Sequence, residues 1–214
     1  MLLSVGGGAP KAPDGSLALA LGVAIAEGLE AFISDHVELK WPNDLVAQDR
    51  KLGGILVETS TQANLGGRTS RPPERRDAFA PGSSAHGGAE TRVVAGLGVN
   101  IRVSEEQRKL VTGEGGLRPA GLSELNLRKA PEPNVLAAAM ITAIADVLES
   151  HPVDGFGRWA DGWNGRDWLA GMRIEARSGV TTYMGVAAGV DSSGALLLED
   201  SDGQRRIVSA EIRL

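Results

Sequence analysis

The chain has 214 residues, of which 42% are hydrophobic and 23% are charged, and its formal net charge is −5. This length suits one globular domain with a small appended unit, and it is enough to bury a core. The acidic balance provides no basic field, so we expect no nucleic-acid partner. The absence of cysteine excludes disulfides and thiol catalysis, and the three histidines share no metal-ligand spacing, so we expect no metal-binding side chains.

No apolar run is judged long enough to span a bilayer, and no signal peptide opens the chain. We therefore expect a cytoplasmic protein with no membrane partner.

In chain order, a short strand and a helix come first. Residues 2–5 are apolar and predict a strand, which the glycines at 6–8 and Pro10 should end as a turn. Apolar residues then recur at helical spacing between residues 17 and 33, which predicts a helix with one buried face.

Two more strands and a polar insertion follow. Residues 37–41 alternate between apolar and charged and predict a half-buried strand ended by Pro42. Residues 48–50 are polar turn material, and 52–59 predict a second strand. Residues 60–92 are rich in Gly, Pro, Ser and charge, so we expect a disordered hairpin insertion.

In the C-terminal half, the spacing of apolar and turn residues changes near Asp167. Before it, the pattern predicts a strand over 93–103, a loop over 113–121, a helix over 134–150 and a shorter helix that contains Trp159 and Trp163. After it, short strands separated by turn residues predict a small β-unit, with strands at 173–177, 182–190, 195–199 and 206–212. We therefore divide the chain into residues 1–167 and 168–214.

The chemistry concentrates in residues 40–58. A hairpin here would bring Lys40, Asn43, Asp44 and Lys51 within reach of one another. Lysine suits a phosphate or a carboxylate that becomes a phosphoanhydride, and aspartate can hold or deprotonate an amine. The alternative is an ordinary solvated hairpin without a functional site, whose lysines protect a sheet edge.

Three motifs in order resemble those of one family. Lys-Trp-Pro-Asn-Asp at 40–44, Lys-Leu-Gly-Gly-Ile-Leu-Val-Glu at 51–58 and Val-Ala-Gly-Leu-Gly-Val-Asn-Ile at 94–101 are similar to motifs of the biotin–protein ligases. The C-terminal residues resemble the small SH3-like domain of that family, through Trp159, Gly171, 185–191, 194–198 and 210–212. The resemblance covers nearly the whole chain apart from 60–92.

The resemblance implies an α+β fold. A class II synthetase-like mixed sheet with flanking helices would occupy 1–167, and a small SH3-like β-barrel would follow. It further implies ligation of biotin to a lysine through biotinyl-5′-AMP, with ATP, Mg²⁺ and biotin. The partner would be the biotin carrier protein domain of a biotin-dependent carboxylase, and a homodimer is possible.

Carried over by position, the family assigns roles in catalysis and nucleotide binding. Lys51 would contact the biotin carboxylate and the α-phosphate, while Asp44 with Lys40 would orient the acceptor lysine. Asn43 would lie by the nucleotide and Mg²⁺, and Asn100 would read the adenine edge.

The resemblance also assigns a biotin pocket, lined by Gly54, Ile55, Leu56, Gly96 and Gly98. Glu211 in the small unit would face the nucleotide or the carrier protein. The alternative is that Glu211 is a solvated carboxylate on a strand, in which case it would have neither role.

The sequence departs from the family at its start. No Gly-Arg-Gly-Arg run occurs in it, although relatives close such a loop over biotin, so we expect an N-terminal truncation and impaired catalysis. We expect no DNA-binding domain, which leaves a repressor role unsupported. The alternatives are a lipoate ligase-like enzyme and a non-catalytic fragment that binds carrier protein or dimerises.

Overall fold

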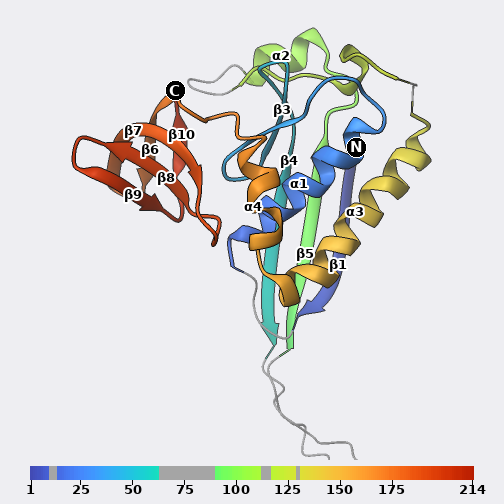
Figure 1. Cartoon of the computed structure of the whole chain (residues 1–214). Coiled ribbons are helices and arrows are strands. Elements are labelled where there is room, and N and C mark those ends of the chain that lie inside the picture. The colour runs from blue at the N-terminus through green and yellow to red at the C-terminus, as the bar shows by residue number, and fades with distance from the viewer. Residues whose placement is uncertain (10–13, 63–89, 112–116, 129–130) are drawn as a thin grey trace, which may run out of the picture.

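The computed structural model describes residues 1–9, 14–62, 90–111, 117–128 and 131–214. It contains two five-stranded sheets and several helices, which confirms the α+β fold class. Figure 1 shows a larger unit, in which helices lie against one sheet, and a small β-unit beside it.

The larger sheet is built from hairpins. Its order is β1-β5-β4-β3-β2, with strands β1 (Leu2–Ala9), β2 (Glu38–Lys40), β3 (Asp44–Ala47), β4 (Arg50–Gln62) and β5 (Glu90–Val99). Every ladder in it is antiparallel, so the expectation of a mixed sheet was wrong for the described strands. Parallel pairing is limited there to two isolated bridges, Leu39 with Asp167 and Lys51 with Pro119.

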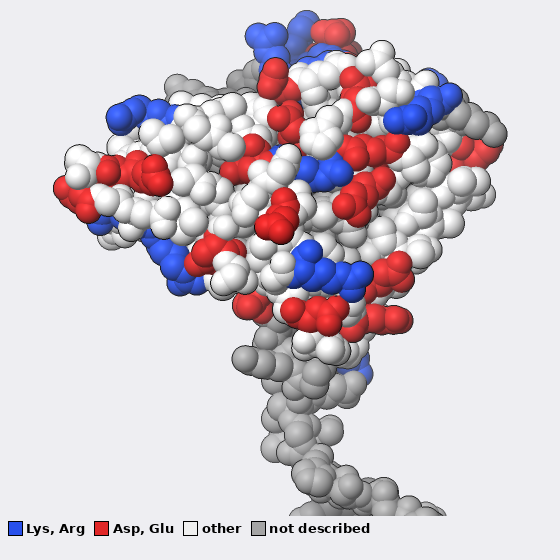
Figure 2. Space-filling view, in the orientation of Figure 1, with Lys and Arg blue, Asp and Glu red and all other residues white. Residues whose placement is uncertain are grey.

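One face of this sheet is covered by helices, and the other, which we call the open face, carries exposed side chains such as Leu56 and Val94 among the described residues. Along β5, residues 93, 95, 97 and 99 are buried whereas 94, 96 and 98 are not, as expected from the two-residue period of a strand. Helices α1 (Ser16–Glu30) and α3 (Pro133–Asp154) pack against the buried side, and α4 (Gly157–Asn164) packs against α1. On the helix side, Figure 2 shows acidic and basic side chains interspersed.

Helix α3 needs a correction. It has 22 residues, and an 18-residue window within it is apolar enough to cross a membrane by length and composition. The expectation that no such run exists was therefore too strict. In this structure α3 packs on α1 and β1 through Leu136, Met140, Ile144 and Val147, all of which are buried.

The small unit is a curled antiparallel sheet in the order β10-β6-β7-β8-β9. Its strands are β6 (Arg173–Ser178), β7 (Thr181–Val190), β8 (Leu196–Asp200), β9 (Gly203–Ile207) and β10 (Glu211–Arg213). Only residues 208–210 connect the two edge strands, a reach of at most ~14 Å. A flat sheet of five strands would separate its edges by ~19 Å, so the sheet must curl. The single strand predicted over 206–212 is thus two strands, on opposite edges.

Other elements differ from prediction as well. The glycines at 6–8 do not end the first strand, because they pair with residues 92–94 of β5. Residues 60–62 and 90–92, assigned to the insertion, extend the β4–β5 ladder, while 63–89 lie outside the described residues. Strand β3, helix α2 (Glu105–Val111) and the 3₁₀ turn η1 (Leu122–Glu124) were not predicted.

The two units meet around β2 and the β3–β4 turn. The indole N–H of Trp41 donates to the carbonyl of Gly194 at 3.1 Å, and that of Trp168 donates to Asp49 Oδ1 at 3.0 Å. The backbone of Leu39 also pairs with residues 166 and 168. The division at 167/168 falls inside this contact and stays a prediction.

Candidate functional site

The β3–β4 hairpin brings a cation and a carboxylate together. Its turn residues Gln48 and Asp49 adopt left-handed backbone conformations, with φ of 51° and 57°, which polar residues tolerate in tight turns. The hairpin sets Asp44 and Lys51 side by side, with Lys51 Nζ 2.5 Å from Asp44 Oδ1. Two of the residues predicted for catalysis are therefore in contact.

This ion pair lies over a glycine of the open sheet face. A Cβ placed on Gly54 would lie 3.4 Å from Asp44 Oδ1 and 3.8 Å from Lys51 Cε. Because Gly54 has no side chain, the charged groups can approach the backbone of the sheet directly. Any larger residue there would compete for the same space.

The open face continues away from the ion pair as a surface with few side chains. Gly54 pairs with Gly98, and two residues farther along β4 Leu56 pairs with Gly96 on the same face. Leu56 is 59% exposed although it is apolar. The four residues form a flat, partly apolar surface next to a charged pair, and we call them the glycine patch.

Ile55 is placed differently from the other predicted pocket residues. Its side chain is 3% exposed and turns toward the helices, where it comes near Gly22 of α1. Only its backbone lies at the site: its N–H donates to the Asn43 carbonyl at 2.9 Å, and its carbonyl accepts from Asn43 Nδ2 at 2.8 Å.

Lys40 and Glu211 extend the charged group. Lys40 ends β2 opposite Asp44 in the ladder. Burial lowers the pKa of Lys40, the positive charge of Lys51 lowers it further, and Asp44 and Glu211 partly oppose this. Glu211 comes from the small unit, and its carboxylate forms an ion pair with Arg213 of the same strand.

Asn43 and Asn100 hold the framework. Asn43 ties the start of β3 to β4 through Ile55, and Asn100 Nδ2 donates to the Lys51 carbonyl at 3.3 Å. The predicted roles of the two asparagines toward a nucleotide stay predictions. Each amide keeps further hydrogen-bonding capacity beyond these contacts.

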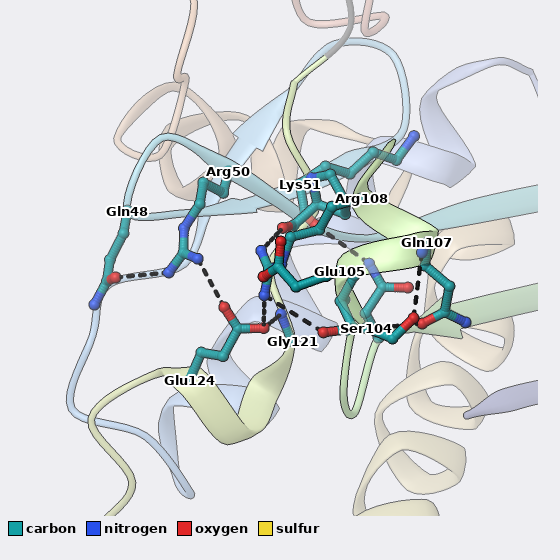
Figure 3. Close-up of polar contacts among 12 residues, drawn as sticks. Gln48, Arg50, Lys51, Ser104, Glu105, Gln107, Arg108, Gly121 and Glu124 are labelled. Carbon is teal, nitrogen blue, oxygen red and sulfur yellow. Dashed lines mark hydrogen bonds and ion pairs between the residues drawn. The ribbon is translucent and has the colours of Figure 1, made fainter. Parts of the chain in front are cut away.

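Sequence reasoning missed a second polar cluster next to Lys51. Arg50, Arg108 and Glu124, from β4, α2 and η1, meet in one network (Figure 3). No sequence motif indicates it, because its members lie up to 74 positions apart and on three different elements. An apolar cavity of about 290 Å³ opens nearby, lined in part by Ile101, Leu122 and Leu136.

The arrangement suits chemistry on an anionic acyl compound. A lysine ammonium can stabilise negative charge as it develops, while a neighbouring carboxylate can hold an amine. Within the described ranges, no group of three or more His, Asp or Glu side chains could hold a metal ion.

Two family models match the sequence. Residues 7–69 match the biotin/lipoate A/B protein ligase family, and residues 171–214 match the biotin protein ligase C-terminal domain. Together they include the hairpin with the ion pair and all five strands of the small unit.

Individual proteins are similar over longer stretches. The chain is 31% identical to the bifunctional ligase/repressor BirA of Escherichia coli (strain K12), over 92% of this chain and 52% of that protein. It is 27% identical to the biotin–[acetyl-CoA-carboxylase] ligase of Paracoccus denitrificans, over 99% of this chain and 77% of that protein. The chain thus spans about half the length of the bifunctional relative.

Among solved structures, a biotin protein ligase from Aquifex aeolicus in complex with biotin and ATP has the same fold. The TM-score is 0.70 at 19% sequence identity, covering 99% of this chain and 77% of that one. At this identity the likeness concerns the fold alone.

Proposed function

Since the chain belongs to the biotin protein ligase family, we propose that it joins biotin to a lysine of a biotin carrier protein domain, with ATP as the energy source. The observation that carries the proposal is the Lys51–Asp44 pair above the glycine patch, with Lys40 opposite Asp44 in the ladder. This is where the three sequence motifs converge in space.

In the first step, the biotin carboxylate attacks the α-phosphate of ATP. The new carboxyl–phosphate bond gives biotinyl-5′-AMP, and pyrophosphate leaves. Lys51 stabilises the negative charge shared by the carboxylate and the α-phosphate. Gly54, Gly96 and Gly98 let the ligand lie against the backbone of the open face, with Leu56 as an apolar contact.

In the second step, the amine of the carrier lysine attacks the acyl carbon of biotinyl-5′-AMP. An amide forms, AMP leaves, and the amine loses a proton. Asp44 orients the amine and receives that proton, and Lys40 balances the charge of the group. Glu211 faces the carrier or the nucleotide from the small unit.

The nucleotide enters as MgATP, whose phosphate oxygens provide ligands for Mg²⁺. We place Asn43 near the phosphates and Asn100, whose Nδ2 donates to the Lys51 carbonyl, near the adenine. The carrier domain of a biotin-dependent carboxylase is the proposed partner, and the cytoplasm is the proposed location.

Two alternatives remain to be separated by experiment. A lipoate ligase-like enzyme would share the larger unit, and the match of residues 171–214 to the biotin protein ligase C-terminal domain favours biotin over it. A non-catalytic fragment would bind carrier protein or dimerise, for which edge strand β1 offers a pairing surface.

The two half-reactions are tested separately with the purified chain. Biotin-dependent pyrophosphate release from MgATP measures adenylation, and mass spectrometry of a carrier domain supplied with synthetic biotinyl-5′-AMP measures transfer. We expect Lys51→Ala to slow adenylation about 10²-fold, and Asp44→Asn to slow transfer more than adenylation. Arg158→Ala, which truncates an exposed side chain of α4, is the matched control and should change neither.

Each alternative predicts its own result. Faster pyrophosphate release with lipoate than with biotin would favour the hypothesis of a lipoate ligase-like enzyme. Binding of the carrier in a calorimeter, without acceleration of either half-reaction, would favour the hypothesis of a non-catalytic fragment and overturn the proposal.

A further inference from the structure

Glu124 joins three separate parts of the chain. Its carboxylate accepts from Arg50 Nη1 of β4 at 2.8 Å, pairs with Arg108 Nη2 of α2 at 2.7 Å and accepts from the Gly121 N–H at 3.0 Å. The hydrogen bond from Arg108 lowers the pKa of Glu124, so the carboxylate is ionised at neutral pH. In Figure 3 it lies between the two guanidinium groups.

These contacts close a ring that begins and ends on neighbouring residues of β4. Residues 118–120 dock on the backbone of Lys51, whose N–H donates to the Arg118 carbonyl at 2.8 Å and whose carbonyl accepts from the Ala120 N–H at 2.8 Å. Arg108 Nη1 donates to the Pro119 carbonyl at 2.9 Å. Glu124 then returns the ring to β4 through Arg50.

The ring has little room to shift. A Cβ placed on Gly121 would lie 2.9 Å from Glu124 Oε1 and 3.0 Å from the Arg102 Cα. The segment is therefore pressed against the backbone that follows β5, with a glycine at the point of closest approach. A change at Glu124 would be transmitted to Lys51 through 118–120 rather than absorbed.

We propose that Glu124 is a positioning residue, which fixes Lys51 through Arg50 and Arg108 without contacting substrate; this rests on the proposed role of Lys51. The side chains of Arg50, Arg108 and Glu124 are each 26% exposed, so solvent partly screens their ion pairs and limits what these pairs contribute to folding. A displacement of about 1 Å in a catalytic group, by contrast, can cost about 10²-fold in rate. The network therefore matters more for geometry than for stability.

The test compares two partners of the same arginine. Glu124→Gln removes the charge but keeps an acceptor for Gly121, whereas Glu105→Gln removes the other, 83% exposed partner of Arg108. We expect Glu124→Gln to lower kcat for adenylation about 10-fold or more with KM for biotin and the melting temperature nearly unchanged. Glu105→Gln should leave all three unchanged.

A double variant tests whether Glu124 acts through Lys51. In a Lys51→Ala background, Glu124→Gln should cause no further loss of adenylation. A full additional loss, or a fall in melting temperature that matches the fall in kcat, would overturn the proposal.

A second readout does not depend on activity. Lysines are dimethylated with ¹³C-formaldehyde, and the Lys51 resonance is assigned from its absence in Lys51→Ala. Glu124→Gln should shift this resonance and Glu105→Gln should not. If the wild type shows no adenylation yet the resonance responds, the proposed function fails and the positioning stands; an unresponsive resonance overturns the positioning itself.

Discussion

Asp167 carries a buried carboxyl group at the junction of the two units. Its Oδ1 accepts the N–H of Leu169 at 3.0 Å, while Oδ2 is buried without a hydrogen-bond partner. Burial raises the pKa of Asp167 to about 6, and the hydrogen bond from Leu169, which lowers the pKa, offsets this only in part. The folded protein therefore favours the protonated form at mildly acidic pH.

The sign and size of the effect on stability follow from this shift. The unfolded chain ionises near the ordinary value of 3.8, so the folded state holds its proton over a wider range. Stability from this group is full below pH 3.8 and falls as the pH rises toward 6. At 1.36 kcal/mol per unit, the loss is about 3 kcal/mol by pH 7.5.

The change to test is Asp167→Asn, which keeps an oxygen for the Leu169 N–H but cannot ionise. We expect the difference in unfolding free energy between variant and wild type to move by about 2–3 kcal/mol in favour of asparagine between pH 4 and pH 7.5. Urea unfolding at a series of pH values measures it, with exposed Asp161→Asn as the control. Parallel pH profiles for wild type and Asp167→Asn would refute the reasoning.

Three further changes probe the small unit and its attachment. Gly194→Ala should destabilise the protein by about 2–4 kcal/mol, because φ is +80° and the new Cβ would lie 2.8 Å from Ser16 Cβ. The control is Gly179→Ala, where φ is +60° but the space is free, and it should lower the melting temperature less in the same thermal melt. Burial alone would raise the pKa of Asp191, but hydrogen bonds from Arg206 and Ser193 hold it well below its usual range. Asp191→Asn should therefore destabilise the protein at pH 7, and the difference in unfolding free energy between variant and wild type should narrow below about pH 4. A difference that stays constant below that pH would contradict this. Trp168→Phe should cost about 1 kcal/mol by loss of the hydrogen bond to Asp49; an unchanged urea midpoint would show that the bond contributes nothing.

Much of the larger unit could be predicted because its patterns are local. The helical spacing between residues 17 and 33 predicts α1, and the alternation around Leu39 predicts β2. The turn chemistry at 48–50 placed Lys51 at the start of a return strand, which is why the contact with Asp44 could be anticipated. The missed strand β3 is only four residues long, too short for its period to stand out.

The failures share a tertiary origin. Glycines at 6–8 favour a turn by intrinsic preference, yet the long partner strand β5 holds them in a ladder. The face of the sheet to which Ile55 turns depends on the strand register, which a motif match does not reveal. The network around Glu124 depends on three elements meeting, and composition carries no trace of that meeting.

The pairing of Leu39 with residues 166–168 also protects the larger sheet. Strand β2 lies at one edge of that sheet, and the linker to the small unit supplies backbone partners on its outer side. Cleavage of the chain at 167/168 and removal of the C-terminal piece would take away the Trp168 N–H that pairs with the Leu39 carbonyl, and would leave the Trp41 indole N–H without its acceptor. Such an exposed strand is a template for pairing with other chains. The isolated larger unit should therefore self-associate, and a protease that cuts this linker should yield aggregates instead of a stable core.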